Sequence, residues 1–89
     1  HCLGLLTPGL VFANDGARFA EAIAAAVPED TEVVVSARPP AGRAATAFAD
    51  LLGTAPTPAV ERAAAAVDPD APAKILFTSG STGQPKGVI

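Results

Sequence analysis

The segment that most constrains this chain is residues 78–87, which read Thr-Ser-Gly-Ser-Thr-Gly-Gln-Pro-Lys-Gly. Its four hydroxyl side chains can donate hydrogen bonds, and its three glycines permit positive φ and a close approach of the backbone to a ligand. Lys86 adds a point charge that suits phosphate, and Pro85 stiffens the side of the loop that carries this lysine. Few of these groups would help to build a core. The segment therefore predicts a loop that binds a polyphosphate.

The residues on either side of this loop predict strands. The apolar run at residues 74–77 favours a buried strand, and residues 87–89 favour the start of another strand. A loop between two strands has no helix amino terminus to offer an anion, so it must use backbone amides, hydroxyls and the lysine. The predicted phosphate-binding residues are Thr78, Ser79, Gly80, Ser81, Thr82, Gly83, Lys86 and Gly87.

Two other phosphate-binding patterns do not fit this loop. The nucleotide-hydrolase pattern needs Gly, four residues and then Gly-Lys-Ser/Thr, but the fifth residue after Gly80 is Pro85, and Gly87 follows the lysine. The dinucleotide pattern G-x-G-x-x-G fails as well, because Ser81 and Thr82 follow Gly80. A Ser/Gly surface turn is the plainer alternative, but such a turn has no need of Pro-Lys-Gly after two pairs of hydroxyls.

Residues 76–87 resemble the AMP-binding signature of the adenylate-forming enzymes, which include acyl- and aryl-CoA ligases, adenylation domains of peptide synthetases, and luciferases. The resemblance implies that the loop holds the β- and γ-phosphates of ATP while a substrate carboxylate attacks the α-phosphate. A weaker likeness at residues 6–13, in the Ala-rich stretch that follows and at residues 73–77 is similar to the feruloyl-CoA synthetase branch.

This resemblance implies an ATP-dependent ligase that forms an acyl-adenylate and then an acyl-CoA thioester, with an aromatic acid such as a hydroxycinnamate as substrate. Lys86 and the loop donors would offset charge on the departing pyrophosphate. ATP, Mg²⁺ and CoA are the implied cofactors and co-substrate, and the magnesium ligands are expected outside this chain. No metal ligand, and no catalytic residue beyond Lys86, is assigned here. Two alternatives stay open: a peptide-synthetase adenylation domain, which passes its acyl group to a carrier protein, and a non-catalytic phosphate-binding scaffold.

The chain is expected to be an internal fragment, residues 1–89, of the large amino-terminal AMP-binding domain. It contains no methionine, and family members are several times longer. The fragment alone is therefore expected to be inactive, marginally stable and prone to associate.

Composition narrows the classes of partner. The net charge is −3 without blocks of one sign, which argues against a nucleic-acid groove or a polybasic membrane patch. No apolar stretch approaches the ~18 residues of a membrane span, and residues 2–6 are too short for a signal peptide. The single cysteine, Cys2, excludes an internal disulfide and fits a reducing compartment. We therefore predict a cytoplasmic enzyme acting on small molecules, with its oligomeric state open, in which Cys2 and His1 are incidental.

Residues 10–36 predict a βαβ scaffold. An apolar run at residues 10–13 is followed by a turn with Asp15 as helix cap, by an amphipathic helix with Phe19, Ile23 and Val27 on one face, and by a β-branched strand at residues 32–35. A right-handed parallel crossover is the default connection. With only Gly16 in its first turn, this unit is predicted to be scaffold and not a nucleotide site.

Residues 37–73 predict a helical connection and residues 74–89 the strand, phosphate loop and next strand, so the fold class is α/β. A short helix is expected at residues 46–52, and a second one with Thr57 as cap and Pro58 in its first turn. Asp68 and Asp70 lie beside prolines and are interpreted as turn residues, in preference to a metal pair.

Overall fold

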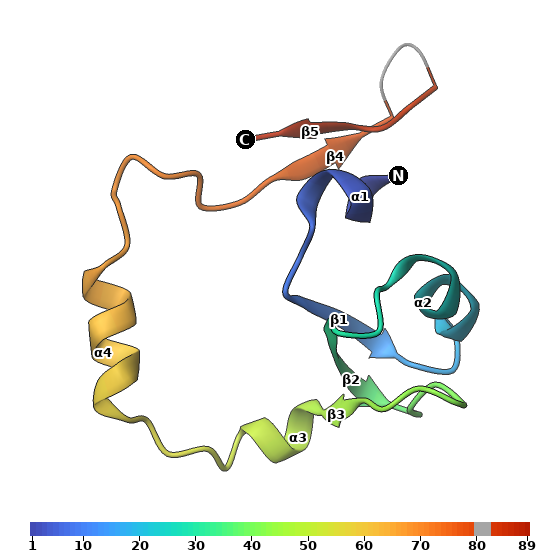
Figure 1. The fold of residues 1–89 in the computed structure, drawn as a ribbon, viewed down its shortest axis with the longest axis horizontal. Coiled ribbons are helices and arrows are strands. Elements are labelled where there is room, and N and C mark those ends of the chain that lie inside the picture. Colours follow the sequence, from blue (N-terminus) through green and yellow to red (C-terminus); the bar gives the residue numbers. More distant parts are fainter. Residues whose placement is uncertain (80–82) are drawn as a thin grey trace. The chain divides into compact units, whose positions relative to one another are not determined.

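The computed structural model describes residues 1–79 and 83–89 as two compact units, one made of His1–Leu5 and Ala55–Ile89 and the other of Leu6–Thr54. The mixed α/β class is confirmed (Figure 1). The elements are α1 (Cys2–Leu6), β1 (Leu10–Asp15), α2 (Ala20–Ala26), β2 (Glu32–Ala37), β3 (Thr46–Ala47), α3 (Phe48–Leu51), α4 (Pro58–Ala65), β4 (Leu76–Thr78) and β5 (Lys86–Val88).

The Leu6–Thr54 unit is built on a parallel sheet in the order β1-β2-β3. The β-branched residues 33–35 of β2 are all buried, as expected of a central strand covered on both faces. Ile23 of α2 and Val27 at its C-cap, both from the predicted apolar face, are buried as well, whereas Phe19, predicted on the same face, is the N-cap and is 39% exposed. Val34 pairs in register with Phe12, whose ring meets that of Phe48 edge-on at 5.9 Å between centroids. The predicted strand–helix–strand with parallel strands is confirmed.

The helix expected at residues 46–52 was placed too early. Thr46 and Ala47 form β3, paired with Val34 and Val35, and α3 begins only at Phe48. The ladder of β2 offers these two residues backbone partners that local helix propensity cannot reveal. The segment at residues 37–73 is therefore not wholly helical. Further along, Thr57 occupies the N-cap of α4 and Pro58 its first turn, as predicted, but the Thr57 side chain makes no capping hydrogen bond.

The β1–α2 turn is tied closely to the end of β2. Asp15 Oδ1 accepts hydrogen bonds from the backbone N–H groups of Ala17 and Arg18, at 3.0 and 3.2 Å. It therefore caps the turn before α2, whose own N-cap is Phe19. A Cβ atom on buried Gly16 would lie 2.5 Å from the carbonyl oxygen of Arg38, so only glycine fits there.

The His1–Leu5 and Ala55–Ile89 unit contains the antiparallel pair β4–β5, with Thr78 opposite Lys86, Phe77 opposite Gly87 and Leu76 opposite Val88. Strands on both sides of the loop are confirmed, but the expectation that the first is buried was wrong. Ile75 is 40% and Leu76 61% exposed, because β4 and β5 form a sheet of only these two strands. Within residues 1–79 and 83–89, no helix is long and apolar enough to cross a membrane.

Candidate phosphate-binding site

The base of the predicted phosphate loop is set by the β4–β5 register. Thr78 ends β4 and lies directly opposite Lys86, which begins β5. Residues directly opposite in an antiparallel pair present their side chains to the same face, with Cβ atoms about 5 Å apart. Both residues are exposed. The hydroxyl of Thr78 and the ammonium group of Lys86 therefore share one solvent-facing side of the ladder, an arrangement suited to a phosphate group.

The glycines of the loop differ in their geometry. Gly83 has φ of +84°, so the positive φ expected of this loop is found there. Gly87 is not in that region, and its need for glycine comes from a neighbouring side chain. Gly80, Ser81 and Thr82 lie outside the described residues, and so does the expectation that the loop is poorly ordered without nucleotide. Ser79, at the end of the described stretch, is exposed.

His1 contacts Pro85, the residue just before β5, and the sequence did not indicate this contact. Its Nε2 atom lies 3.1 Å from the carbonyl oxygen of Pro85. Because a carbonyl oxygen only accepts, Nε2 must carry the proton in this contact. The bond orients the peptide group that joins Pro85 to Lys86. The two residues are too far apart in the chain for any sequence pattern to link them.

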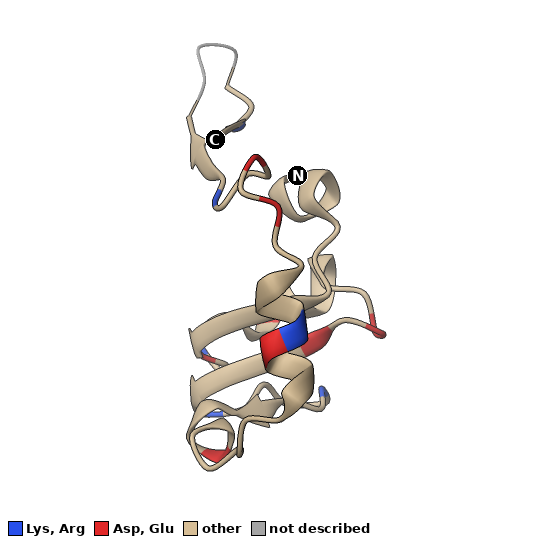
Figure 2. Cartoon of the chain, turned by 90° about the vertical axis from the view of Figure 1, so that its left-hand side faces the viewer, with Lys and Arg blue, Asp and Glu red and all other residues tan. Residues whose placement is uncertain are grey.

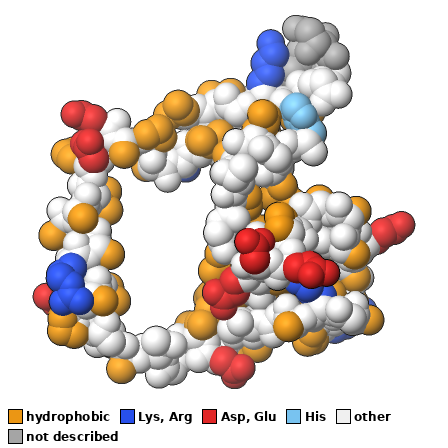
Figure 3. All heavy atoms as spheres, in the orientation of Figure 1, with side chains coloured by type: hydrophobic (Ala, Val, Ile, Leu, Met, Phe, Trp, Pro, Cys, Tyr) orange, Lys and Arg blue, Asp and Glu red, His pale blue; other side chains and the backbone are white. Residues whose placement is uncertain are grey.

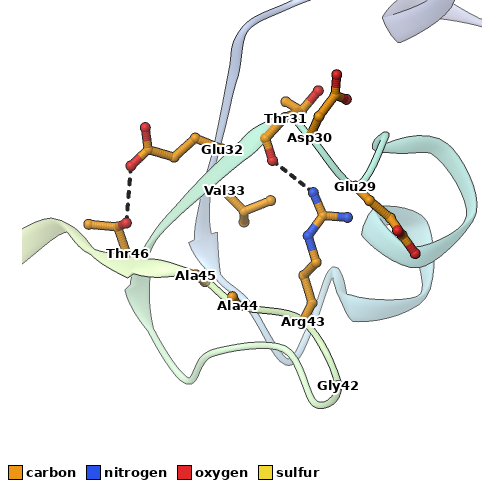
Figure 4. A pocket seen from close by; sticks show the side chains of 10 residues that line it. All are labelled: Glu29, Asp30, Thr31, Glu32, Val33, Gly42, Arg43, Ala44, Ala45 and Thr46. Atoms are coloured by element: carbon orange, nitrogen blue, oxygen red, sulfur yellow. Dashed lines mark hydrogen bonds between the residues drawn. The ribbon is translucent and has the colours of Figure 1, made fainter.

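A separate pocket of about 490 Å³ lies in the Leu6–Thr54 unit (Figure 4). Its lining residues are Glu29, Asp30, Thr31, Glu32, Val33, Gly42, Arg43, Ala44, Ala45 and Thr46. The guanidinium group of Arg43 donates hydrogen bonds to the carbonyl oxygens of Val27, Pro28 and Thr31, at 3.1, 2.7 and 2.8 Å. This cation therefore satisfies the carboxyl end of α2 and the following turn. The pocket's one arginine is structural.

The described residues do not form a metal centre. Among residues 1–79 and 83–89, no group of three or more His, Cys, Asp or Glu side chains could hold a metal ion. Asp68 Oδ1 accepts a hydrogen bond from the N–H of Asp70 at 2.9 Å, and the Asp68 carbonyl accepts one from Ala71 at 3.0 Å. The interpretation of these acids as turn residues is confirmed. In the described part of the loop, hydroxyls and a lysine suit phosphate oxygens better than a magnesium ion, which prefers carboxylates.

Comparisons with known proteins assign the chain to a family. The chain belongs to the AMP-binding enzyme family, whose pattern matches all of residues 1–89. A stretch of 41 residues is 65% identical to phenyloxazoline synthase MbtB of Mycolicibacterium paratuberculosis strain ATCC BAA-968 / K-10. The match covers 46% of this chain and 3% of that protein, so the chain spans only a small part of its relative. No solved structure matches. The narrower resemblance to the feruloyl-CoA synthetase branch stays a prediction.

Proposed function

We propose that this chain supplies the ATP-phosphate loop of an adenylate-forming ligase. The observation that carries the proposal is family membership over the whole of residues 1–89. The site adds physical support, because Thr78 and Lys86 are held opposite one another at the loop base. The other proposed contacts with the ATP phosphates come from Ser79, Gly80, Ser81, Thr82, Gly83 and Gly87.

In the proposed reaction, a carboxylate oxygen of the substrate attacks the α-phosphorus of ATP. The bond between this phosphorus and the bridging oxygen breaks, pyrophosphate departs with the electron pair, and an acyl-adenylate is formed. Negative charge grows on the β- and γ-phosphates as the bond breaks, and the Lys86 ammonium group and loop hydroxyls stabilise it. Bound magnesium would neutralise phosphate charge as well, and no protein ligand for it is assigned among the described residues.

The proposed substrate is an aromatic carboxylic acid. The sequence resemblance implied an acid such as a hydroxycinnamate, and the name phenyloxazoline synthase supports the aromatic part. The carbon between the oxygen and the nitrogen of an oxazoline ring is at the oxidation level of a carboxylic acid. Building such a ring from an aromatic acid requires activation of its carboxyl group, which is what adenylation provides.

The acceptor of the acyl group separates two candidates. The first is CoA, whose thiol would attack the acyl-adenylate and release AMP. The second is the thiol of a carrier protein, as in a peptide-synthetase adenylation domain. The relative favours the second, because its named product is a phenyloxazoline and not a CoA thioester. A non-catalytic phosphate-binding scaffold is the remaining alternative.

ATP–pyrophosphate exchange by the complete enzyme that contains this chain tests the proposal. Radiolabelled pyrophosphate should enter ATP in the presence of one acid from a panel of hydroxycinnamates, hydroxybenzoates and amino acids. AMP release on adding CoA, compared with adding a phosphopantetheinylated carrier protein, then assigns the acceptor. If no acid supports exchange but the protein still binds ATP, the protein is a non-catalytic phosphate-binding scaffold and the proposal is wrong. The 89-residue chain alone is expected to show no exchange.

A further inference from the structure

We propose that Gly87 is a positioning residue for Lys86, and that its lack of a side chain lets Ile75 and Phe77 pack across it and hold β5 in register with β4. The inference rests on the proposed function, because it concerns how the loop places its lysine. It gives Gly87 a role that needs no contact with phosphate.

The pleat of the ladder separates Gly87 from the face that carries Lys86. Phe77 lies directly opposite Gly87, and Ile75, just before β4, lies on the same side, because a Cβ atom built on Gly87 would meet both side chains. Thr78 and Lys86 form the neighbouring opposed pair and therefore point to the other side. A side chain at position 87 would point away from the face proposed to meet the phosphates.

Contact distances show what excludes a side chain at position 87. A Cβ atom built on Gly87 would lie 2.9 Å from Cγ2 of Ile75, closer than real Cβ contacts allow. Two ring carbons of Phe77 would lie 3.7 and 3.9 Å away, which is ordinary van der Waals contact. Cγ2 is bonded directly to Cβ of a β-branched residue with a stiff χ1 angle, so moving it requires a rotamer change or a backbone shift. Ile75 is thus the residue that makes glycine necessary.

The backbone at Gly87 gives no other reason for glycine. Its φ is outside the positive region, in contrast to Gly83 at +84°, and a Cβ on Gly83 would meet nothing within 4 Å. The two glycines therefore act differently: Gly83 permits a backbone conformation, and Gly87 permits side-chain packing. An aromatic ring laid over a cross-strand glycine is a recognised means of stabilising a ladder. A two-stranded ladder needs such support, because it is only marginally stable alone.

The test is a rescue experiment in the complete enzyme. The rate of adenylation is measured by ATP–pyrophosphate exchange, with an acid that supports this exchange. Gly87→Ala should slow adenylation about tenfold or more, because overpacking displaces Ile75 or β5. The double variant Gly87→Ala with Ile75→Ala removes Cγ2 and should recover most of the lost rate, relative to Ile75→Ala alone. Gly83→Ala is the matched control: it is strained by positive φ, so adding Ile75→Ala should not rescue it.

Formation of the thioester from pre-made acyl-adenylate serves as the check on folding. If Gly87→Ala impairs adenylation alone and Ile75→Ala restores it, the positioning role is supported. If Gly87→Ala abolishes both half-reactions, recovery of both by the double variant supports the same steric cause. Absence of rescue in either case, or an unimpaired Gly87→Ala, overturns the inference. Lys86→Ala is measured in parallel: if it leaves adenylation intact, the proposed function itself fails, whereas its impairment without rescue at Gly87 sinks only this inference.

Discussion

Asp15, at the end of β1, forms an ion pair with Arg38, which follows β2, and the sequence did not indicate this pair. Arg38 adopts φ of +46°, an uncommon conformation for a residue with a side chain, and its guanidinium group pairs with the carboxylate of Asp15. The hydrogen bond from Arg38 holds the pKa of Asp15 below its ordinary value of 3.8, and the N–H groups of Arg18 and Ala17 add to the effect. A carboxyl group with a lowered pKa in the folded state stabilises the fold above its unfolded pKa, and this stabilisation is lost as pH falls through the folded pKa.

We predict that Asp15→Asn lowers the stability of the chain near neutral pH and flattens the pH dependence of this stability below about pH 4. The amide cannot form the ion pair and accepts hydrogen bonds through only one oxygen. Urea unfolding of the chain at pH 7 and pH 3, followed by circular dichroism, measures both effects. Glu29→Gln, at an exposed carboxylate, is the control. An Asp15→Asn variant whose stability changes with pH as steeply as that of the natural chain would contradict this role.

Helices and strands whose residues follow a local periodic pattern could be predicted from the sequence. The β-branched run at residues 33–35 and the spacing of Ile23 and Val27 are local patterns, and these residues are buried as expected, although Phe19 from the same predicted face is exposed. The strand at Thr46 was missed because its pairing with Val34 joins segments well separated in the chain.

The same distinction applies to the candidate site. Its loop and the flanking strands follow from one continuous motif. The dependence of Gly87 on Ile75 and the contact of His1 with Pro85 are tertiary contacts that no local pattern encodes.

A second prediction concerns the hydrogen bonds by which Arg43 joins the end of α2 to the residues before β2. Arg43→Lys should destabilise the Leu6–Thr54 unit by about 1–2 kcal/mol, because an ammonium group cannot reproduce the planar fork that reaches three carbonyl oxygens. Chemical denaturation checks this, with Arg62→Lys on exposed α4 as control. Equal stability of the two lysine variants would show that the hydrogen bonds of Arg43 contribute little to the free energy of unfolding.

The exposed surface of the whole chain carries many apolar side chains. Ile23, Val27 and residues 33–35 are buried, whereas Phe12, Leu52 and Val67 are among many large apolar side chains that are exposed. Figure 3 shows apolar side chains at many points on the visible face. Figure 2 shows acidic and basic residues at many points along the chain. Exposure on this scale is consistent with the expectation of marginal stability and association, which stays a prediction.

Lys86→Ala in the complete enzyme tests whether the loop holds the phosphates of ATP during adenylation. A charged hydrogen bond to phosphate contributes roughly 1.5–3 kcal/mol, so adenylation should slow about 10- to 150-fold. Thioester formation from a pre-made acyl-adenylate involves no pyrophosphate and should be nearly unchanged. Single-turnover rates of the two half-reactions, measured separately, give the answer. We expect adenylation alone to be slowed; intact adenylation, or equal damage to both steps, would show that Lys86 and its loop do not hold the departing pyrophosphate.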